Sequence, residues 1–423
     1  MSDRKIYTPE GVQDILGDLS YGKRKIENEI LQLFESFGYE EVQTPIVEFY
    51  DTFAVEKDLM PQEKMFKFFD AQGKILVLRP DMTIPVARIA ATKLKKENAL
   101  QRFSYIGNAF RYNEFGGGKQ KEFTQAGVEL LGDNSPNSDA EVIVLAINSL
   151  LKAGLSEFQI DIGQVEFFRG ITEEAMLTPV QAENLRLFID TKDYLGIGNF
   201  INELDIKDEL KQLILSLPEF FGSLDAIDKA EQYVLNKKSI DALENVRETL
   251  KIIDGYGLSK YVSVDLGMVP GLDYYTGIIF RGFTYGIGFP VLSGGRYDNL
   301  VEKFGLKKPA TGFSVGINML MNALLRQYGS TVLEKPKTDI LFYTDRDSVI
   351  TGYELCKKLR SVGYTVEVMF AGNNPENSQK SKYKMIIKFS NDKVEITDCL
   401  HSESLIVYTT DEFSEKFIRR AKE

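Results

Sequence analysis

Residues 271–277 read GLDYYTG and residues 293–300 read SGGRYDNL, and these two stretches decide the fold. Between them, the apolar run at residues 278–280 predicts a β-strand, and residues 261–264 just upstream alternate as another strand. Downstream, residues 311–325 predict a strand that turns into a helix. Strands therefore flank both stretches, which indicates that they belong to a sheet.

The N-terminal third predicts a helix followed by several strands. Ile26, Ile30 and Phe34 recur at helical spacing, and Gly38 is a typical residue after a helix C-terminus. Ser138 and Glu141 match a capping box, which predicts that another helix starts at Ser138. Further strands are expected at residues 41–44, 65–69, 75–78, 104–112, 123–131 and 158–165.

The chain divides into a main domain and a small C-terminal domain. Residues 1–325 are expected to form the main domain, and within it residues 172–258 show charged helical periodicity without strand patterns. We interpret this part as a helical insertion. Residues 326–337 are expected to be a linker, and residues 338–423 alternate strands and helices as a small α/β domain. The predicted class is α+β, because hairpin strands precede the insertion and strands of the same sheet follow it.

Composition indicates a soluble globular protein. Of the 423 residues, 43% are hydrophobic and 27% are charged. No apolar run approaches the roughly 20 residues of a membrane span, and the first residues lack an apolar signal region. We therefore expect a cytoplasmic protein without membrane association. The net charge of −11, from 51 basic and 62 acidic residues, argues against non-specific binding to nucleic acid.

Several kinds of catalytic or metal site are excluded by residue counts. His401 is the single histidine, and Cys356 and Cys399 are the two cysteines. A Ser-His-Asp triad or a Cys-His dyad therefore cannot form in the first 400 residues, and a zinc cluster is not expected. Gly286 and Gly288 lack the third glycine of a dinucleotide fingerprint. We expect neither a metal nor a cofactor.

Five stretches in a fixed order resemble the class II aminoacyl-tRNA synthetases, and specifically histidyl-tRNA synthetase. The resemblance spans residues 8 to about 325, with a looser match in the C-terminal domain, which resembles a reduced anticodon-binding domain. It implies an antiparallel sheet of six or seven strands and a dimer formed through the first helix and the strand ending at Pro45. The five stretches are residues 38–45, 78–83, 110–129, 271–277, and 293–300 with 312–316.

The resemblance also implies a pocket for histidine. In that family, positions matching Glu129 and Tyr275 hold the imidazole ring, and positions matching Asp81, Thr83 and Gln125 hold the amino group. Tyr274 and the neighbouring glycines shape the pocket, and Arg111 is the arginine that remains near the glycine-rich loop. Acceptors and neutral donors suit an ammonium group and a ring N–H. The alternative is that these residues are only buried polar groups of the sheet.

Departures from the synthetases concern the positive groups that adenylate transfer needs. Pro270 stands where the synthetases have an arginine, and Asn318 and Met319 stand where they have a Glu-Arg pair. Lys119 and Lys121 replace arginines of the glycine-rich loop, and lysine loses bidentate phosphate recognition. We therefore expect no catalytic residues and no aminoacylation.

Residues 79–83, RPDMT, and 124–127, TQAG, resemble a particular paralogue of histidyl-tRNA synthetase. This paralogue is the regulatory subunit of the short-form ATP phosphoribosyltransferase, which catalyses the first step of histidine biosynthesis. The resemblance implies a non-catalytic subunit that is needed for the activity of a short catalytic chain and for feedback by histidine. It also implies a homodimer within a hetero-oligomer, and we do not expect tRNA binding.

Two other functions remain open at this point. The chain could be a divergent histidyl-tRNA synthetase, or a histidine-sensing or RNA-binding module in translational control. Histidine could bind in the synthetase-like pocket or at a subunit interface.

Overall fold

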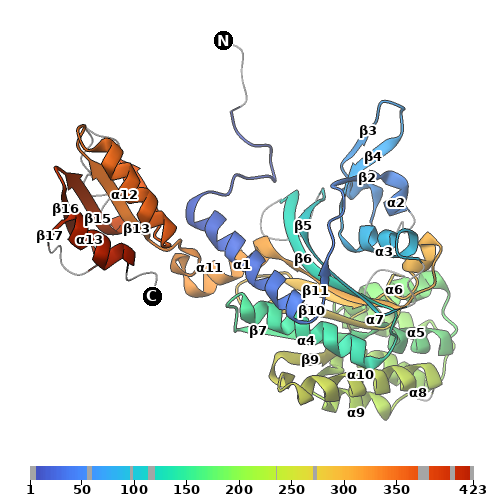
Figure 1. Ribbon diagram of the computed structural model, residues 1–423. Helices are drawn as coiled ribbons and strands as arrows, with labels where there is room; N and C mark the ends of the chain where they lie inside the picture. The colour runs from blue at the N-terminus through green and yellow to red at the C-terminus, as the bar shows by residue number, and fades with distance from the viewer. Residues whose placement is uncertain are drawn as a thin grey trace. The chain divides into compact units, whose positions relative to one another are not determined.

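The structure is a computed structural model that divides into two compact units, Met1–Glu334 and Lys335–Glu423 (Figure 1). It describes residues 6–54, 60–95, 99–112, 120–234, 236–269, 274–369, 381–400 and 405–419.

A nine-stranded sheet forms the centre of the first unit, in the order β1-β5-β6-β12-β11-β10-β7-β9-β8. The six strands from β5 to β7 are paired antiparallel, as the resemblance implied. Short strands extend both edges, and two of the added pairings, β1 with β5 and β7 with β9, are parallel. The strands are β1 Glu40–Glu41, β5 Gln101–Phe110, β6 Glu122–Leu131, β7 Phe158–Gln164, β8 Phe221–Gly222, β9 Val262–Asp265, β10 Ile278–Thr284, β11 Leu292–Arg296 and β12 Ala310–Gly316.

One face of this sheet is covered by long helices and holds the main hydrophobic core. The helices are α1 Gly17–Ser36, α4 Pro136–Lys152, α10 Lys237–Gly255 and α11 Ile317–Tyr328, and Figure 1 shows α1 and α4 running across the sheet. Ile26, Ile30 and Phe34 of α1 are buried in this core, as their helical spacing predicted. The predicted strands and helices of the first unit are therefore largely confirmed.

The opposite face of the sheet carries a smaller layer. Its three-stranded sheet has the order β2-β4-β3, with β2 Val47–Phe49, β3 Lys67–Phe69 and β4 Ile75–Leu78. The predicted hairpin is β3–β4, and Gly73 in its turn has φ of 80°, which suits glycine. Two helices, α2 Tyr50–Ala54 and α3 Thr83–Thr92, complete the layer. Its core cluster includes Met82 and Tyr105.

The helical insertion is present between β7 and β9. It contains α5 Val165–Glu174, α6 Pro179–Asp190, α7 Tyr194–Asn202, α8 Asp208–Ser216, α9 Asp225–Glu231 and α10. The first of these helices starts directly after β7, so the helical segment begins earlier than residue 172. The insertion also contains β8, which pairs with β9 and thereby joins the main sheet.

Two local predictions in this unit are wrong. The strand expected at residues 41–44 is only Glu40–Glu41. The helix α4 starts at Pro136 rather than Ser138, and the expected capping box does not form. Instead, the Ser138 hydroxyl donates to the carbonyl oxygen of Ser135, and the Glu141 carboxylate accepts two hydrogen bonds of 2.8 Å from Arg102. Other partners therefore take the two side chains that a capping box would pair.

The segment expected to be a linker, residues 326–337, is partly built into the first unit. The helix α11 continues to Tyr328, and a 3₁₀ turn follows at Ser330–Leu333. Leu333 is buried against Gly22 of α1, where an added Cβ would lie 2.7 Å from the Leu333 Cβ. The boundary between the two units falls after Glu334.

The second unit is a five-stranded sheet in the order β14-β13-β15-β16-β17. Its strands are β13 Thr338–Thr344, β14 Val366–Met369, β15 Tyr383–Ser390, β16 Lys393–Asp398 and β17 Leu405–Thr409. The helices α12 Val349–Ser361 and α13 Thr410–Ser414 accompany them, followed by a π-helical segment at Glu415–Arg419. Cys356 is buried in the core of this unit, which raises the pKa of its thiol to about 11.

Candidate functional site

A cavity of about 200 Å³ lies on the α3 side of the nine-stranded sheet. Strand β6 shows why polar groups gather there. Ala126, Val128 and Leu130 are buried in the core under α1 and α4, so the alternate residues Gln125 and Glu129 face the other side. All seven residues predicted for the histidine pocket line this cavity, namely Asp81, Thr83, Arg111, Gln125, Glu129, Tyr274 and Tyr275. Their role in binding a ligand stays a prediction.

Glu129 forms the buried floor of the cavity and is 1% exposed. One carboxylate oxygen accepts a hydrogen bond of 3.1 Å from the Tyr105 hydroxyl, and the other accepts one from the Tyr297 hydroxyl. Burial raises the pKa of Glu129 to about 8, although hydrogen bonds from Tyr297, Thr83 and Tyr105 favour the ionised form. This carboxyl group is therefore close to its titration midpoint near neutral pH.

Gly312 makes room for the Glu129 carboxylate. It lies directly opposite Glu129 in the pairing of β12 with β6. A Cβ at this position would lie 1.8 Å from a carboxylate oxygen of Glu129, so any other residue would displace the acid. The glycine of the family motif is therefore required by close packing at this point.

Three tyrosines form an aromatic wall beside Glu129. The rings of Tyr274 and Tyr297 are stacked with centroids 5.3 Å apart, and the Tyr275 ring meets Tyr274 edge-on at 4.7 Å. Burial raises the pKa of all three phenols above the ordinary value of tyrosine. These hydroxyls therefore stay protonated at neutral pH and can donate hydrogen bonds to a ligand or to Glu129.

Two acceptors for a positive group, Asp81 and Gln125, also line the cavity. One oxygen of Asp81 accepts a hydrogen bond of 3.0 Å from the backbone N–H of Ile84, which fixes the carboxylate at the start of α3. The side-chain nitrogen of Gln125 donates to the Ser314 hydroxyl at 3.3 Å. The Gln125 carbonyl oxygen is buried and has no partner among the described residues. A ligand with an ammonium group would satisfy this acceptor, whose isolation costs about 1–3 kcal/mol.

Arg111 restrains Asp81. Its Nε donates to the carbonyl oxygen of Pro80 at 2.5 Å, and its Nη2 lies 3.6 Å from an Asp81 carboxylate oxygen. The guanidinium also lies over the Phe123 ring, 5.3 Å from its centroid. These contacts hold Arg111 at the rim of the cavity and leave it partly neutralised by Asp81.

Two of the positions that differ from the synthetases, Asn318 and Met319, carry no charge. The Asn318 side-chain oxygen accepts a hydrogen bond of 2.9 Å from the backbone N–H of Thr124, so it ties α11 to β6. Met319 packs against the main hydrophobic core. Lys121 is described, and its ammonium lies 5.5 Å from the centroid of the Tyr112 ring. Pro270, Lys119 and His401 lie outside the described residues.

Two important residues of the cavity were not predicted. Tyr105 and Tyr297 each donate a hydrogen bond to one carboxylate oxygen of Glu129. Gly127 was the available signal for Tyr105. A glycine in the middle of a strand indicates a close approach, and a Cβ at Gly127 would lie 2.6 Å from the Tyr105 hydroxyl.

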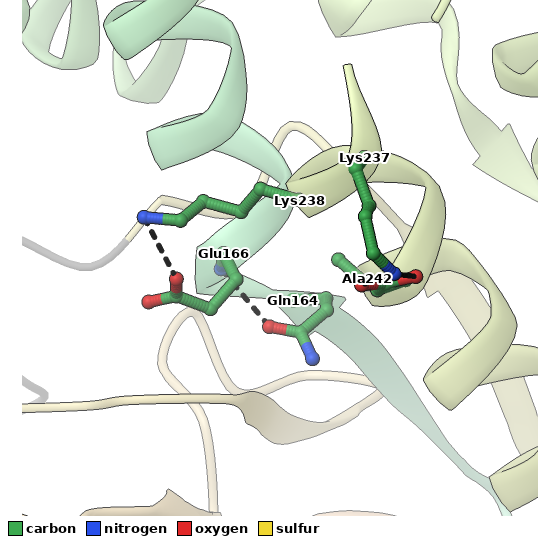
Figure 2. Close-up of a pocket in the computed structure, with 6 residues that line it drawn as sticks. Gln164, Glu166, Lys237, Lys238 and Ala242 are labelled. Carbon is green, nitrogen blue, oxygen red and sulfur yellow. Dashed lines mark hydrogen bonds and ion pairs between the residues drawn. The ribbon is translucent and has the colours of Figure 1, made fainter. Parts of the chain in front are cut away.

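Another cleft, of about 480 Å³, lies between α5 and α10 (Figure 2). Its charged side chains neutralise one another, because Lys238 lies 3.4 Å from Glu166 and Lys237 lies 2.9 Å from Asp241. None of the seven predicted residues lines this cleft. It therefore offers no unpaired group that would select a ligand.

Two further searches bear on metals and membranes. Within the described ranges, no three side chains of His, Cys, Asp or Glu are grouped in a way that could hold a metal ion. None of the helices in the same ranges has the length and apolar character needed to cross a membrane.

Comparison with known proteins identifies the family. Residues 11–320 match the family described as histidyl-tRNA synthetase. A protein of Acetivibrio thermocellus named ATP phosphoribosyltransferase regulatory subunit is 58% identical to this chain over 379 residues, which is 90% of each chain. The chain belongs to the ATP phosphoribosyltransferase regulatory subunit family. The paralogue indicated by residues 79–83 and 124–127 is thereby confirmed.

Solved structures confirm the class II synthetase-like fold of this regulatory subunit family. A Bacillus halodurans structure described as an ATP phosphoribosyltransferase regulatory subunit/histidyl-tRNA synthetase has a TM-score of 0.83 and 32% identity, and covers 92% of this chain and 99% of its own. Histidyl-tRNA synthetase from a Nostoc species has a TM-score of 0.79 at 21% identity, covering 98% of this chain and 99% of its own. The second likeness supports the fold alone.

Proposed function

We propose that this chain is the non-catalytic regulatory subunit of a short-form ATP phosphoribosyltransferase in the cytoplasm, and that it conveys feedback by histidine. The observation that carries the proposal is the contrast between two halves of one site. The residues expected to hold an amino acid, among them Glu129, Tyr275, Asp81 and Gln125, line one cavity. At the positions expected to handle ATP, Asn318 accepts a hydrogen bond from a backbone amide and Met319 packs against the core.

Histidine suits the charges and the size of the cavity. Its ammonium group would meet Asp81 and the unpaired oxygen of Gln125, and its imidazole would meet Glu129. The volume of about 200 Å³ lies below the roughly 300–1,000 Å³ typical of pockets for drug-sized ligands. A ligand the size of an amino acid therefore fits this space better than a larger one.

Adenylate transfer is not expected from this arrangement. Phosphoryl chemistry depends on cations held against the phosphates, and the loss of one such donor commonly costs about 10²–10³ in rate. Methionine and asparagine supply no positive charge at Met319 and Asn318. Family membership also favours a regulatory role, since the relatives are named for regulation rather than for charging tRNA.

A homodimer within the hetero-oligomer is part of this proposal. One face of the three-stranded sheet carries Val47 and Phe49 of β2, Phe68 of β3, and Leu76 and Leu78 of β4, which the strand register places together. Phe49 is 49% exposed and Val47 is 42% exposed. A contiguous apolar face of this kind is typical of a protein–protein interface. The strand β2 of this face begins at Val47, shortly after Pro45, where the resemblance implied the dimer contact.

Reconstitution with the catalytic chain tests the regulatory role. The short catalytic chain is assayed for phosphoribosyl transfer to ATP alone and after addition of this chain. We expect activity to appear or to rise sharply on addition, because the regulatory chain must bind the competent state of its partner more tightly than the idle state. Equal activity with and without this chain would contradict the proposal.

A further inference from the structure

A second cavity, of about 360 Å³, lies on the same face of the nine-stranded sheet as the Glu129 cavity. The alternation of buried residues places its charged side chains. Ile160 and Ile162 of β7 and Phe280 of β10 are buried in the main core on the far face. The intervening residues Asp161 and Arg281 therefore face the cavity, which they line.

Asp161 and Arg281 lie directly opposite each other but do not form an ion pair. The strand register pairs them across β7 and β10, where Cβ atoms are typically about 4.5–5.5 Å apart. Asp161 instead accepts a hydrogen bond from the Ser263 hydroxyl. In the described part of the chain, the Arg281 guanidinium has neither a hydrogen bond nor an ion pair. The Arg281 guanidinium is thus available to pair with a ligand in the cavity.

A second carboxylate strengthens the negative side of the cavity. Asp265 lies at the end of β9, and one of its carboxylate oxygens accepts a hydrogen bond of 3.0 Å from the backbone N–H of Gly267. Burial raises the pKa of both Asp161 and Asp265, and the charge of Asp161 adds to the effect on Asp265. Lys192 opposes these shifts by its charge, but it makes no ion pair with another described residue. Charges of both signs therefore face the space without neutralising each other by contact.

An apolar wall separates this cavity from the one around Glu129. Met268 lines the second cavity and Tyr275 lines the first. Both pack into one small cluster with Val165 and Ile279. The two cavities are neighbours, but their charged groups belong to different sets.

We propose that the second cavity binds a free α-amino acid as a zwitterion. The ligand carboxylate would pair with the Arg281 guanidinium, whose geometry suits bidentate binding, and the ammonium would pair with Asp161 and Asp265. A simple cation would leave Arg281 unpaired, and a simple anion would be repelled by the carboxylates that line the cavity. The apolar part of the lining favours an apolar side chain on the ligand, and it consists of Ile189, Pro218, Phe221, Met268 and Phe283. Asp190 also lines the cavity as a third acidic residue.

Calorimetry on the full-length Glu129→Gln chain tests this proposal. The substitution is made so that amino-acid binding in the first cavity is weakened. L-leucine is compared with 3-methylbutylamine, which lacks the carboxylate, and with 4-methylpentanoate, which lacks the ammonium. We expect one molecule of L-leucine to bind per chain, about tenfold or more tightly than either analogue, since each analogue leaves charges in the cavity unpaired. No binding of L-leucine, or equal binding of an analogue, would overturn the proposal.

Variants in the same background assign the binding to this cavity. Arg281→Gln is expected to weaken L-leucine about tenfold or more, and Asp161→Asn to do the same. Lys192→Gln, at an exposed position, gives a weaker loss without risk to folding. Arg346→Gln, an exposed position in the second unit, is the control and should bind as the parent does. L-leucine binding that is unchanged in folded Arg281→Gln, or in Lys192→Gln, would place the ligand elsewhere.

Discussion

Glu129 couples the chemistry of the first cavity to pH. Its folded-state pKa of about 8 lies above the ordinary value of 4.5, and burial is the main cause. The folded state therefore holds the proton more tightly than the unfolded state does. A group of this kind contributes stability that is fully present below its unfolded pKa and is lost as pH rises through its folded pKa.

This shift predicts a change of stability with pH for the ligand-free protein. The free energy of unfolding should fall between about pH 4.5 and pH 8 through the Glu129 contribution. Glu129→Gln cannot ionise and should remove that part of the slope. Urea unfolding of the wild type and the variant at pH 5, 6, 7 and 8 measures the difference. Parallel curves for the two proteins would contradict the raised pKa.

The seven cavity residues could be predicted from the sequence because each lies in one of the five stretches that resemble histidyl-tRNA synthetase. Tyr105 could not, because a tyrosine within a strand pattern is an ordinary core residue until its partner is known. Its partner Glu129 is 24 residues away, and the pairing of β5 with β6 brings the two together. The second cavity was missed for the same reason, since Asp161 and Arg281 are far apart in the chain.

At the scale of elements, a buried ion network anchors the 293–300 stretch to α4. Arg296 Nη2 lies 3.0 Å from Asp139 and donates to the Ser138 hydroxyl at 2.8 Å, and Nη1 lies 3.1 Å from Asp298. Burial raises the pKa of Asp139, and the charge of Arg296 opposes that shift. This network explains why Ser138 does not act as a helix cap. Its hydroxyl has partners that short-range spacing cannot reveal.

Loss of one partner in this network should destabilise the first unit. Asp139→Asn leaves the Arg296 charge buried and only partly paired, which typically costs about 3–5 kcal/mol. The exposed pair of Lys237 and Asp241 is the matched control, and Lys237→Ala should cost less than about 1 kcal/mol. Urea unfolding of both variants gives the comparison. Similar small losses in the two would show that the Arg296 network contributes little.

At the scale of the whole molecule, the order of strands was predictable in outline and the edges were not. The six antiparallel strands have long apolar or alternating patterns. In contrast, β1 and β8 contain two residues each, too few to show any period. The expected linker is longer than the real one because Val332 and Leu333 are only a short apolar pair in a polar stretch. The burial of Leu333 against α1 depends on tertiary contact.

The apolar face of the three-stranded sheet predicts a dimer of this chain. Phe49→Asp should convert a dimer to a monomer, because a buried charge at the interface would lack a partner. Tyr285→Asp, at an exposed position away from this sheet, is the control and should remain a dimer. Light scattering over a range of protein concentrations gives the mass. A wild-type chain that is monomeric throughout would contradict the proposed interface.

The central claim is that histidine acts on the enzyme through the Glu129 cavity of this chain. The direct test is histidine inhibition of phosphoribosyl transfer by the reconstituted assembly, with each assembly scaled to its own uninhibited rate. Glu129→Gln removes a charged acceptor for the ligand, worth roughly 1.5–3 kcal/mol, which corresponds to a rise of about 10–100-fold in the histidine concentration for half inhibition. Glu203→Gln, an exposed residue of the insertion, should leave this concentration unchanged. Inhibition of the Glu129→Gln assembly at the wild-type histidine concentration would contradict the account.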